Sequence, residues 1–186
     1  MDAFDEMIKR EHQRLIIFEK KYKDADLHHI TSVRNAISIL DNGINASLSF
    51  GIQYGIWCYN DVPLRDILQA GFPVVSHRYI IARGLNLPVY VDFVISKTGI
   101  VGKLEPDFDI GYLALNAPRY QIIEQENIAP QYLHFSGLYE GDNFLEKPDK
   151  IPGERCMAMA DDIPPEYLKS FLQSIAEQTT ETIRDV

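Results

Sequence analysis

The chain is short of cysteine, long apolar runs and basic residues, and each shortage excludes a class of protein. Its 186 residues include two cysteines, too few for the disulfide framework of a small secreted domain. A membrane-spanning helix needs about 20 consecutive apolar residues, and every apolar run in this sequence is far shorter. The first residues include Asp2, Asp5 and Glu6, the reverse of the basic start of a signal peptide. We therefore expect a soluble cytoplasmic protein with no membrane partner.

Acidic residues outnumber basic ones, 27 to 18, which gives a formal net charge of −9. Because contacts to phosphates dominate the affinity of proteins for DNA and RNA, this charge argues against tight nonspecific binding of nucleic acid. It still allows a local basic pocket, to which Arg78, Arg83 and Arg119 would contribute. The sequence also lacks zinc-type Cys and His spacing, a calcium loop and both glycine-rich phosphate-binding motifs, so we expect no bound metal.

The length and composition are those of one globular domain, which we expect to span residues 1–186. Hydrophobic spacing and capping residues predict helices at 3–23, 32–41, 61–70 and 161–184, the second of them ending at Asn42-Gly43. Strands are predicted at 27–31, within 50–60, and at 88–96, 110–115 and 120–124. Residues 136–155 are rich in Gly, Asp, Pro and Lys and predict a long loop that lasts to about residue 160. This order of elements predicts an α+β fold, with a core over residues 27–135 between terminal helices.

The most informative stretch begins at Leu27-His-His-Ile-Thr31. Alternation along a strand places His29 and Thr31 on one face, with His28 as a partly exposed neighbour on the other. An imidazole and a hydroxyl that point the same way offer a polar ligand two directed hydrogen bonds. A simpler interpretation is that both groups form hydrogen bonds with the backbone or with water. Another is that Thr31 is the N-cap of the following helix, which would remove it from ligand binding.

The second informative stretch is the run from Phe50 to Asn60, which combines glycines with aromatic residues. Gly51 and Gly55 weaken a strand without packing anything, which indicates that something approaches the backbone closely there. Tyr54, Trp57 and Tyr59 offer flat apolar faces on which a ring can stack. A single Trp in a chain of this length is more commonly a core anchor. A hydrogen-bonding pair, a helix and an aromatic platform in this order favour a nucleotide-like ligand.

The same residues resemble a known family. A strand with His29-Ile-Thr31, a helix that ends at Asn42-Gly43, and then Gly55-Ile-Trp-Cys58 are similar to the NAD-binding half of ADP-ribosyltransferases of the His-Tyr-Glu type. That group includes poly-ADP-ribose polymerases, DarT-type DNA ADP-ribosyltransferase toxins and RNA 2'-phosphotransferases. The resemblance covers residues 27–60 and, more weakly, 119–133. It implies a split β-sandwich in which two small sheets flank an NAD cleft.

The resemblance also assigns roles to individual residues. His29 and Thr31 would hold the NAD, and Tyr54 and Trp57 would sandwich the nicotinamide, with Trp in place of the family's usual Tyr. Tyr59 would belong to the same cofactor site. Alignment on Ile128-Ala129-Pro130 places Gln121 where the family has its catalytic Glu, whereas a shifted register would place Glu124 or Glu126 there.

This difference matters chemically, because cleavage of the nicotinamide bond passes through a positively charged ribose. A carboxylate offsets that charge, whereas a neutral amide at Gln121 keeps only the hydrogen bond. Some mono-ADP-ribosyltransferases of the family lack the Glu. The resemblance therefore implies a toxin-like or effector-like transferase that moves ADP-ribose to a protein or nucleic-acid acceptor and has an inhibitor or antitoxin as a further partner.

Two alternatives remain open. One is a catalytically weak or inactive module that binds NAD or a nucleotide and acts through protein partners. The other is an accidental resemblance in an α+β structural or interaction protein.

Overall fold

The computed structural model describes residues 26–49, 53–60, 76–107, 119–141 and 153–184, together with Glu6, Lys9 and Gln13. The helices are α2 (Val33–Asn42), α4 (His77–Gly84) and α6 (Pro165–Arg184), with short 3-10 turns η1 (Lys97–Gly99), η2 (Pro130–Tyr132) and η3 (Ala160–Asp162). The strands are β1 (Leu27–Ser32), β2 (Ile44–Asn45), β3 (Ser47–Ser49), β4 (Gln53–Asn60), β5 (Val89–Ile95), β6 (Lys103–Asp107), β7 (Arg119–Ile123), β8 (Asn127–Ile128), β9 (Leu133–Gly141) and β10 (Glu154–Met159).

The strands form one large antiparallel sheet and one small one. In the large sheet the order is β10-β9-β5-β1-β4-β7-β6, and β3 pairs with β4 off this path. Strands β2 and β8 form a separate two-stranded sheet. The predicted α+β class is confirmed.

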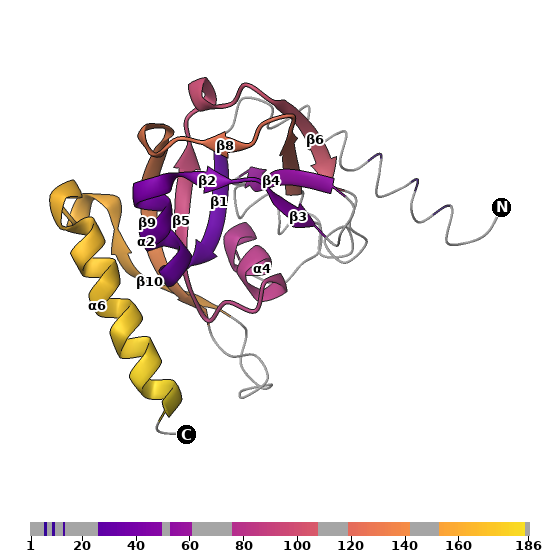
Figure 1. Ribbon diagram of the computed structural model, residues 1–186. Coiled ribbons are helices and arrows are strands. Elements are labelled where there is room, and N and C mark those ends of the chain that lie inside the picture. Colours follow the sequence, from indigo (N-terminus) through magenta and orange to yellow (C-terminus); the bar gives the residue numbers. More distant parts are fainter. Residues whose placement is uncertain are drawn as a thin grey trace.

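The large sheet consists of two halves that meet along a very short contact. Strand β1 pairs with β5 through six residue pairs, but with β4 through only two, Leu27 with Asn60 and His28 with Tyr59. Figure 1 shows β1 and β4 diverging steeply from this contact. We call the contact the junction. It separates a β5 half (β10, β9, β5, β1) from a β7 half (β3, β4, β7, β6).

Helices cover both faces of the sheet. Helices α2 and α6 lie side by side on one face (Figure 1) and enclose the major core, whose most buried members are Ala36, Val91, Phe93, Ile122, Ile128, Leu138 and Leu172. Helix α4 covers the other face and encloses a smaller core of Ile30, Tyr59, Tyr79, Ile80, Ile81, Ala82, Tyr90 and Tyr139. None of the helices in the described ranges is long and apolar enough to cross a membrane.

Helix α2 forms close to where the sequence predicts it. The Ser32 hydroxyl caps it by accepting a hydrogen bond from the backbone N–H of Asn35, 3.2 Å away. Val33, Ala36 and Ile39, three residues apart, form its buried stripe. The helix ends at Gly43, which has φ +77° and donates its N–H to the carbonyl of Ile39.

Most other predicted elements are confirmed where the structure describes them. Strands β5 and β7 match the predictions at 88–96 and 120–124, and α6 matches the final helix. The predicted helices at 3–23 and 61–70 and the strand at 110–115 lie outside the described residues, apart from Glu6, Lys9 and Gln13, which are helical.

The loop predicted from residue 136 is wrong for the residues that the structure describes there. Strand β9 runs through Gly137 and Gly141, and residues 154–159 form β10. The glycines mark places where rings lie over the backbone: a Cβ at Gly137 would touch the Tyr139 ring, and one at Gly141 would touch Tyr79. They are spacers for tyrosines in a strand, not turn residues.

Both cysteines are free. Cys58 is buried in the major core, and burial raises the pKa of its thiol, as expected for an inert cysteine. Cys156 lies exposed on β10.

Candidate ligand site at the junction

His29 lies at the point where β1 and β4 begin to diverge. Its Nδ1 is 2.7 Å from the backbone carbonyl oxygen of Trp57, a residue of β4. A carbonyl only accepts hydrogen bonds, so Nδ1 carries the proton. Burial lowers the pKa of His29, and the hydrogen bond to Trp57 and the charge of Asp92 oppose this only in part. The ring is therefore neutral at neutral pH, and its Nε2 is an acceptor able to bind a hydroxyl.

The lowered pKa predicts a pH dependence of stability. Below 6.5, the ordinary pKa of histidine, the unfolded chain binds a proton that folded His29 does not bind, so acid favours unfolding. The free energy of unfolding should fall by up to about 1.4 kcal/mol per pH unit as the pH drops from 6.5 toward the folded pKa. Urea denaturation between pH 5 and 8 measures this.

The matched variants for this titration are His29→Gln, which cannot titrate, and His134→Gln, at an exposed position on β9. The first should flatten the pH dependence, and the second should leave it as in the wild type. If the free energy of unfolding changes equally with pH in all three proteins, His29 is not the source of the pH dependence.

Thr31 points to the same face of β1 as His29, as predicted from alternation. It is not the N-cap of α2, because Ser32 has that role. Thr31 is, however, only 6% exposed, so a ligand would reach it only if its surroundings moved. The Thr31 hydroxyl therefore does not cap the helix, but it does not lie at the surface either.

Trp57 is partly exposed and lies on β4 directly opposite Gln121 on β7. Residues paired across antiparallel strands share a face, so Trp57 and Gln121 are side by side. Gly55, two residues before Trp57, is on that face too, and a Cβ there would collide with the Gln121 side chain at 2.1 Å. The close approach predicted over Gly55 is thus made by Gln121 of the chain itself.

His28 and Tyr59 are both buried, and both bind Asp92. The His28 Nδ1 is 3.0 Å from each carboxylate oxygen of Asp92, and the Tyr59 hydroxyl donates to Oδ2 at 3.1 Å. The expectation that His28 is a partly exposed neighbour is wrong, because its ring is held in this interior network. Tyr59, 1% exposed, belongs to the same network and not to an open ligand surface.

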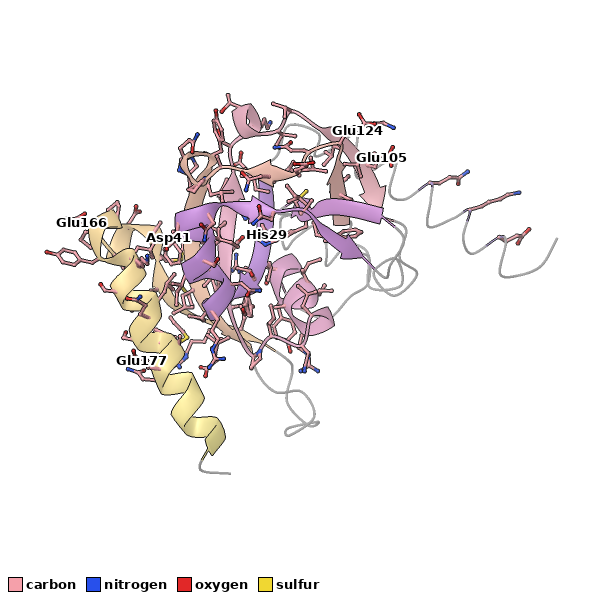
Figure 2. All side chains as sticks on the ribbon, viewed as in Figure 1. His29, Asp41, Glu105, Glu124, Glu166 and Glu177 are labelled. Atoms are coloured by element: carbon pink, nitrogen blue, oxygen red, sulfur yellow. The ribbon has the colours of Figure 1, made fainter. Side chains whose placement is uncertain are left out.

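The two predicted catalytic positions lie in different surroundings. Gln121 is 6% exposed within the sheet, beside Trp57. Glu124 is exposed, with φ +60°, beyond the last paired residue of β7. Figure 2 shows Glu124 apart from His29. The structure therefore brings Gln121, and not Glu124, next to the aromatic strand.

A neighbouring glutamine fixes the turn that carries Glu124. The amide of Gln125 accepts from two backbone N–H groups and donates to two carbonyls; the four partners are Val101, Gly102, Gly99 and Asn127. Three of these bonds hold the turn to residues 99–102, at the end of η1 and before β6, and the fourth, to Asn127, lies within the turn. Glu124 consequently stays at that end of the sheet.

The remaining predicted residues contribute less. Tyr54 lies on β4 opposite Leu48, but its side chain is outside what the structure describes, so the nicotinamide sandwich stays a prediction. Arg78 forms an ion pair with Glu154 at 2.8 Å, and its guanidinium lies 4.0 Å from the centre of the Tyr139 ring. These contacts hold the Arg78 guanidinium beneath α4, so it does not contribute to an anion-binding pocket.

Sequence reasoning missed Asp92 and Glu105. Asp92 is the one charged residue in the apolar run Val89–Ile95, and a lone acid in a central strand is a signal that it has buried partners. Glu105 lies on β6 directly opposite Gln121, which only the strand register reveals. It forms an ion pair with Lys103.

Within the described ranges, no group of three His, Cys, Asp or Glu residues could hold a metal. A cavity of about 200 Å³ lies between α4 and the start of β5, lined by Tyr79, Ala82, Arg83, Asn86, Leu87, Pro88, Tyr90 and Gly141. It includes Arg83, considered above for a basic pocket, but none of the residues predicted to bind NAD. Comparisons of the chain with family models, with curated proteins and with solved structures gave no match.

Proposed function

We propose that the chain binds NAD at the junction and transfers its ADP-ribose to a macromolecular acceptor, as an ADP-ribosyltransferase with a split β-sandwich. The observation that carries the proposal is the hydrogen bond from His29 to the Trp57 carbonyl. It joins the two sequence stretches that resemble this family at the place where the halves of the sheet separate.

The chemistry of His29 suits a ribose. A neutral imidazole with its proton on Nδ1 offers Nε2 as an acceptor for a ribose hydroxyl. Trp57 is partly exposed on the adjacent strand, but by strand register its side chain shares the face of Tyr59 and His28, opposite to that of His29. Nicotinamide would therefore stack on the Trp57 ring by reaching past the edge where β1 and β4 diverge. The formal net charge of −9 fits an acceptor that is a protein better than one that is a nucleic acid.

The proposed reaction breaks the bond between ribose C1' and the nicotinamide nitrogen. Nicotinamide leaves with the electron pair, the acceptor nucleophile attacks C1', and the acceptor's proton passes to solvent. The transition state carries positive charge on the ribose, which a nearby carboxylate stabilises.

The position of Gln121 favours a second candidate function. This neutral side chain occupies the place beside Trp57, while the exposed Glu124 is held at the far end of β7. Such an arrangement supports an NAD-binding module with weak or no catalysis that acts through a protein partner. Turnover distinguishes the two functions, whereas NAD binding is common to both.

Titration calorimetry with NAD tests the shared step. The wild type should bind, and His29→Ala should weaken binding by about 1–3 kcal/mol, because the ribose hydroxyl loses its acceptor. Emission of Trp57, the single tryptophan, should be quenched as NAD saturates the protein.

The control for this titration is His134→Ala on β9, which should bind NAD like the wild type. Absence of NAD binding by the folded wild type would refute both candidate functions.

A further inference from the structure

The junction holds a buried carboxylate that binds both strands at once. Of the two residue pairs that join β1 to β4, one is His28 with Tyr59. Asp92, on β5 and 1% exposed, accepts from the ring nitrogen of His28 and from the hydroxyl of Tyr59. A single side chain of the β5 half therefore fixes both members of a pair that connects the halves.

The rings of this pair are also in contact with each other. Their centroids are 5.3 Å apart with a 40° tilt, so the Asp92 oxygens set the positions of two touching rings. A buried carboxylate that is bonded to two donors resists displacement, because moving it would leave a charge unpaired in the interior. Backbone pairing is minimal here, so these side-chain bonds are a large part of what fixes the contact.

The candidate ligand site begins at the residues next to this pair. His29 follows His28 on β1, and Trp57 lies two residues before Tyr59 on β4. Any rotation of one half against the other would alter the 2.7 Å approach of His29 Nδ1 to the Trp57 carbonyl. The geometry of the site thus depends on the pair that Asp92 holds.

We infer that Asp92 is a positioning residue that fixes the angle between the two halves of the sheet and so sets the approach of His29 to Trp57. Asp92 touches no ligand in this role and acts through His28 and Tyr59. The effect on NAD rests on the proposed function, whereas the effect on the junction does not.

The substitution Asp92→Asn tests this with little change of shape. An amide is neutral and has one acceptor oxygen where the carboxylate has two, so one of the two oxygens that His28 Nδ1 approaches at 3.0 Å becomes an N–H donor that faces the ring nitrogen. At temperatures well below unfolding, the emission maximum of Trp57 and its quenching by iodide should differ from the wild type. The Kd for NAD should rise at least 10-fold.

Two further variants make the result specific. Tyr59→Phe removes one of the two bonds and should shift the Trp57 emission in the same direction by a smaller amount; it also serves if Asp92→Asn does not fold. Asp41→Asn removes an exposed carboxylate that pairs with Lys169 between α2 and α6, and it should leave the emission unchanged.

The inference is overturned if folded Asp92→Asn and Tyr59→Phe both melt at lower temperature yet keep the wild-type emission and quenching of Trp57. That outcome would make Asp92 a contributor to stability alone. If the wild type binds no NAD, the proposed function fails, and the emission of Trp57 still decides the role of Asp92.

Discussion

Gly43→Ala should lower the free energy of unfolding by about 3 kcal/mol or more, the sum of a strained backbone and a steric overlap. Gly43 has φ +77° and ψ −172°, a conformation that is nearly exclusive to glycine. A Cβ at this position would lie 2.1 Å from the carbonyl oxygen of Ile128, which belongs to the backbone of β8. Neither the conformation nor the overlap can relax without separating β2 from β8.

Chemical denaturation of Gly43→Ala beside Gly84→Ala measures this. Gly84 is exposed in the last turn of α4, where alanine should change stability by less than about 1 kcal/mol in either direction. If Gly43→Ala lowers the free energy of unfolding by as little as Gly84→Ala does, then β8 can shift to accommodate the added Cβ.

Gly43 also shows how far the sequence predicts the fold. Asn42-Gly43 correctly marks the end of α2, because a helix end is a local event decided by a few neighbouring residues. The contact with Ile128 is not predictable from that pair, since it joins residues 85 positions apart through β2 and β8. Local signals therefore located α2, β5 and α6, while pairing between distant strands had to come from the structure.

The same distinction between local signals and long-range contacts applies to the candidate site. Alternation along β1 correctly placed His29 and Thr31 on one face, and the tautomer of His29 became clear only from the Trp57 carbonyl across the junction. Gly55 was correctly recognised as a place of close approach, but the approaching group is Gln121 from another strand. Asp92 was missed because its partners lie 64 and 33 residues away.

Under the proposed function, the charge beside Trp57 would determine whether bound NAD is cleaved or only held. Gln121→Glu should raise the rate of nicotinamide release from NAD by about 100-fold, the scale on which one aimed electrostatic group changes a rate. Glu has the shape of Gln, so it fits over Gly55 and opposite Trp57. It adds the carboxylate that offsets the charge on the ribose. The measurement is single-turnover release of nicotinamide with and without candidate protein acceptors.

Glu124→Gln is the matched control, because it makes the reverse change three residues along the chain. Glu124 is exposed and held at the far end of β7 by the Gln125 contacts, so this variant should release nicotinamide at the wild-type rate. A fall of 100-fold or more in Glu124→Gln, with NAD affinity unchanged, would instead identify Glu124 as the carboxylate that acts in the transition state.

Glu105→Gln completes the set, because Glu105 lies opposite Gln121 on the other side from Trp57. If the wild type already releases nicotinamide rapidly and only Glu105→Gln abolishes this, then a carboxylate from β6 replaces the one that Gln121 lacks. If the wild type and Gln121→Glu both bind NAD and neither releases nicotinamide with any acceptor, the site holds NAD without cleaving it. The chain then acts as a binding module, and the neutral amide beside Trp57 is the physical reason.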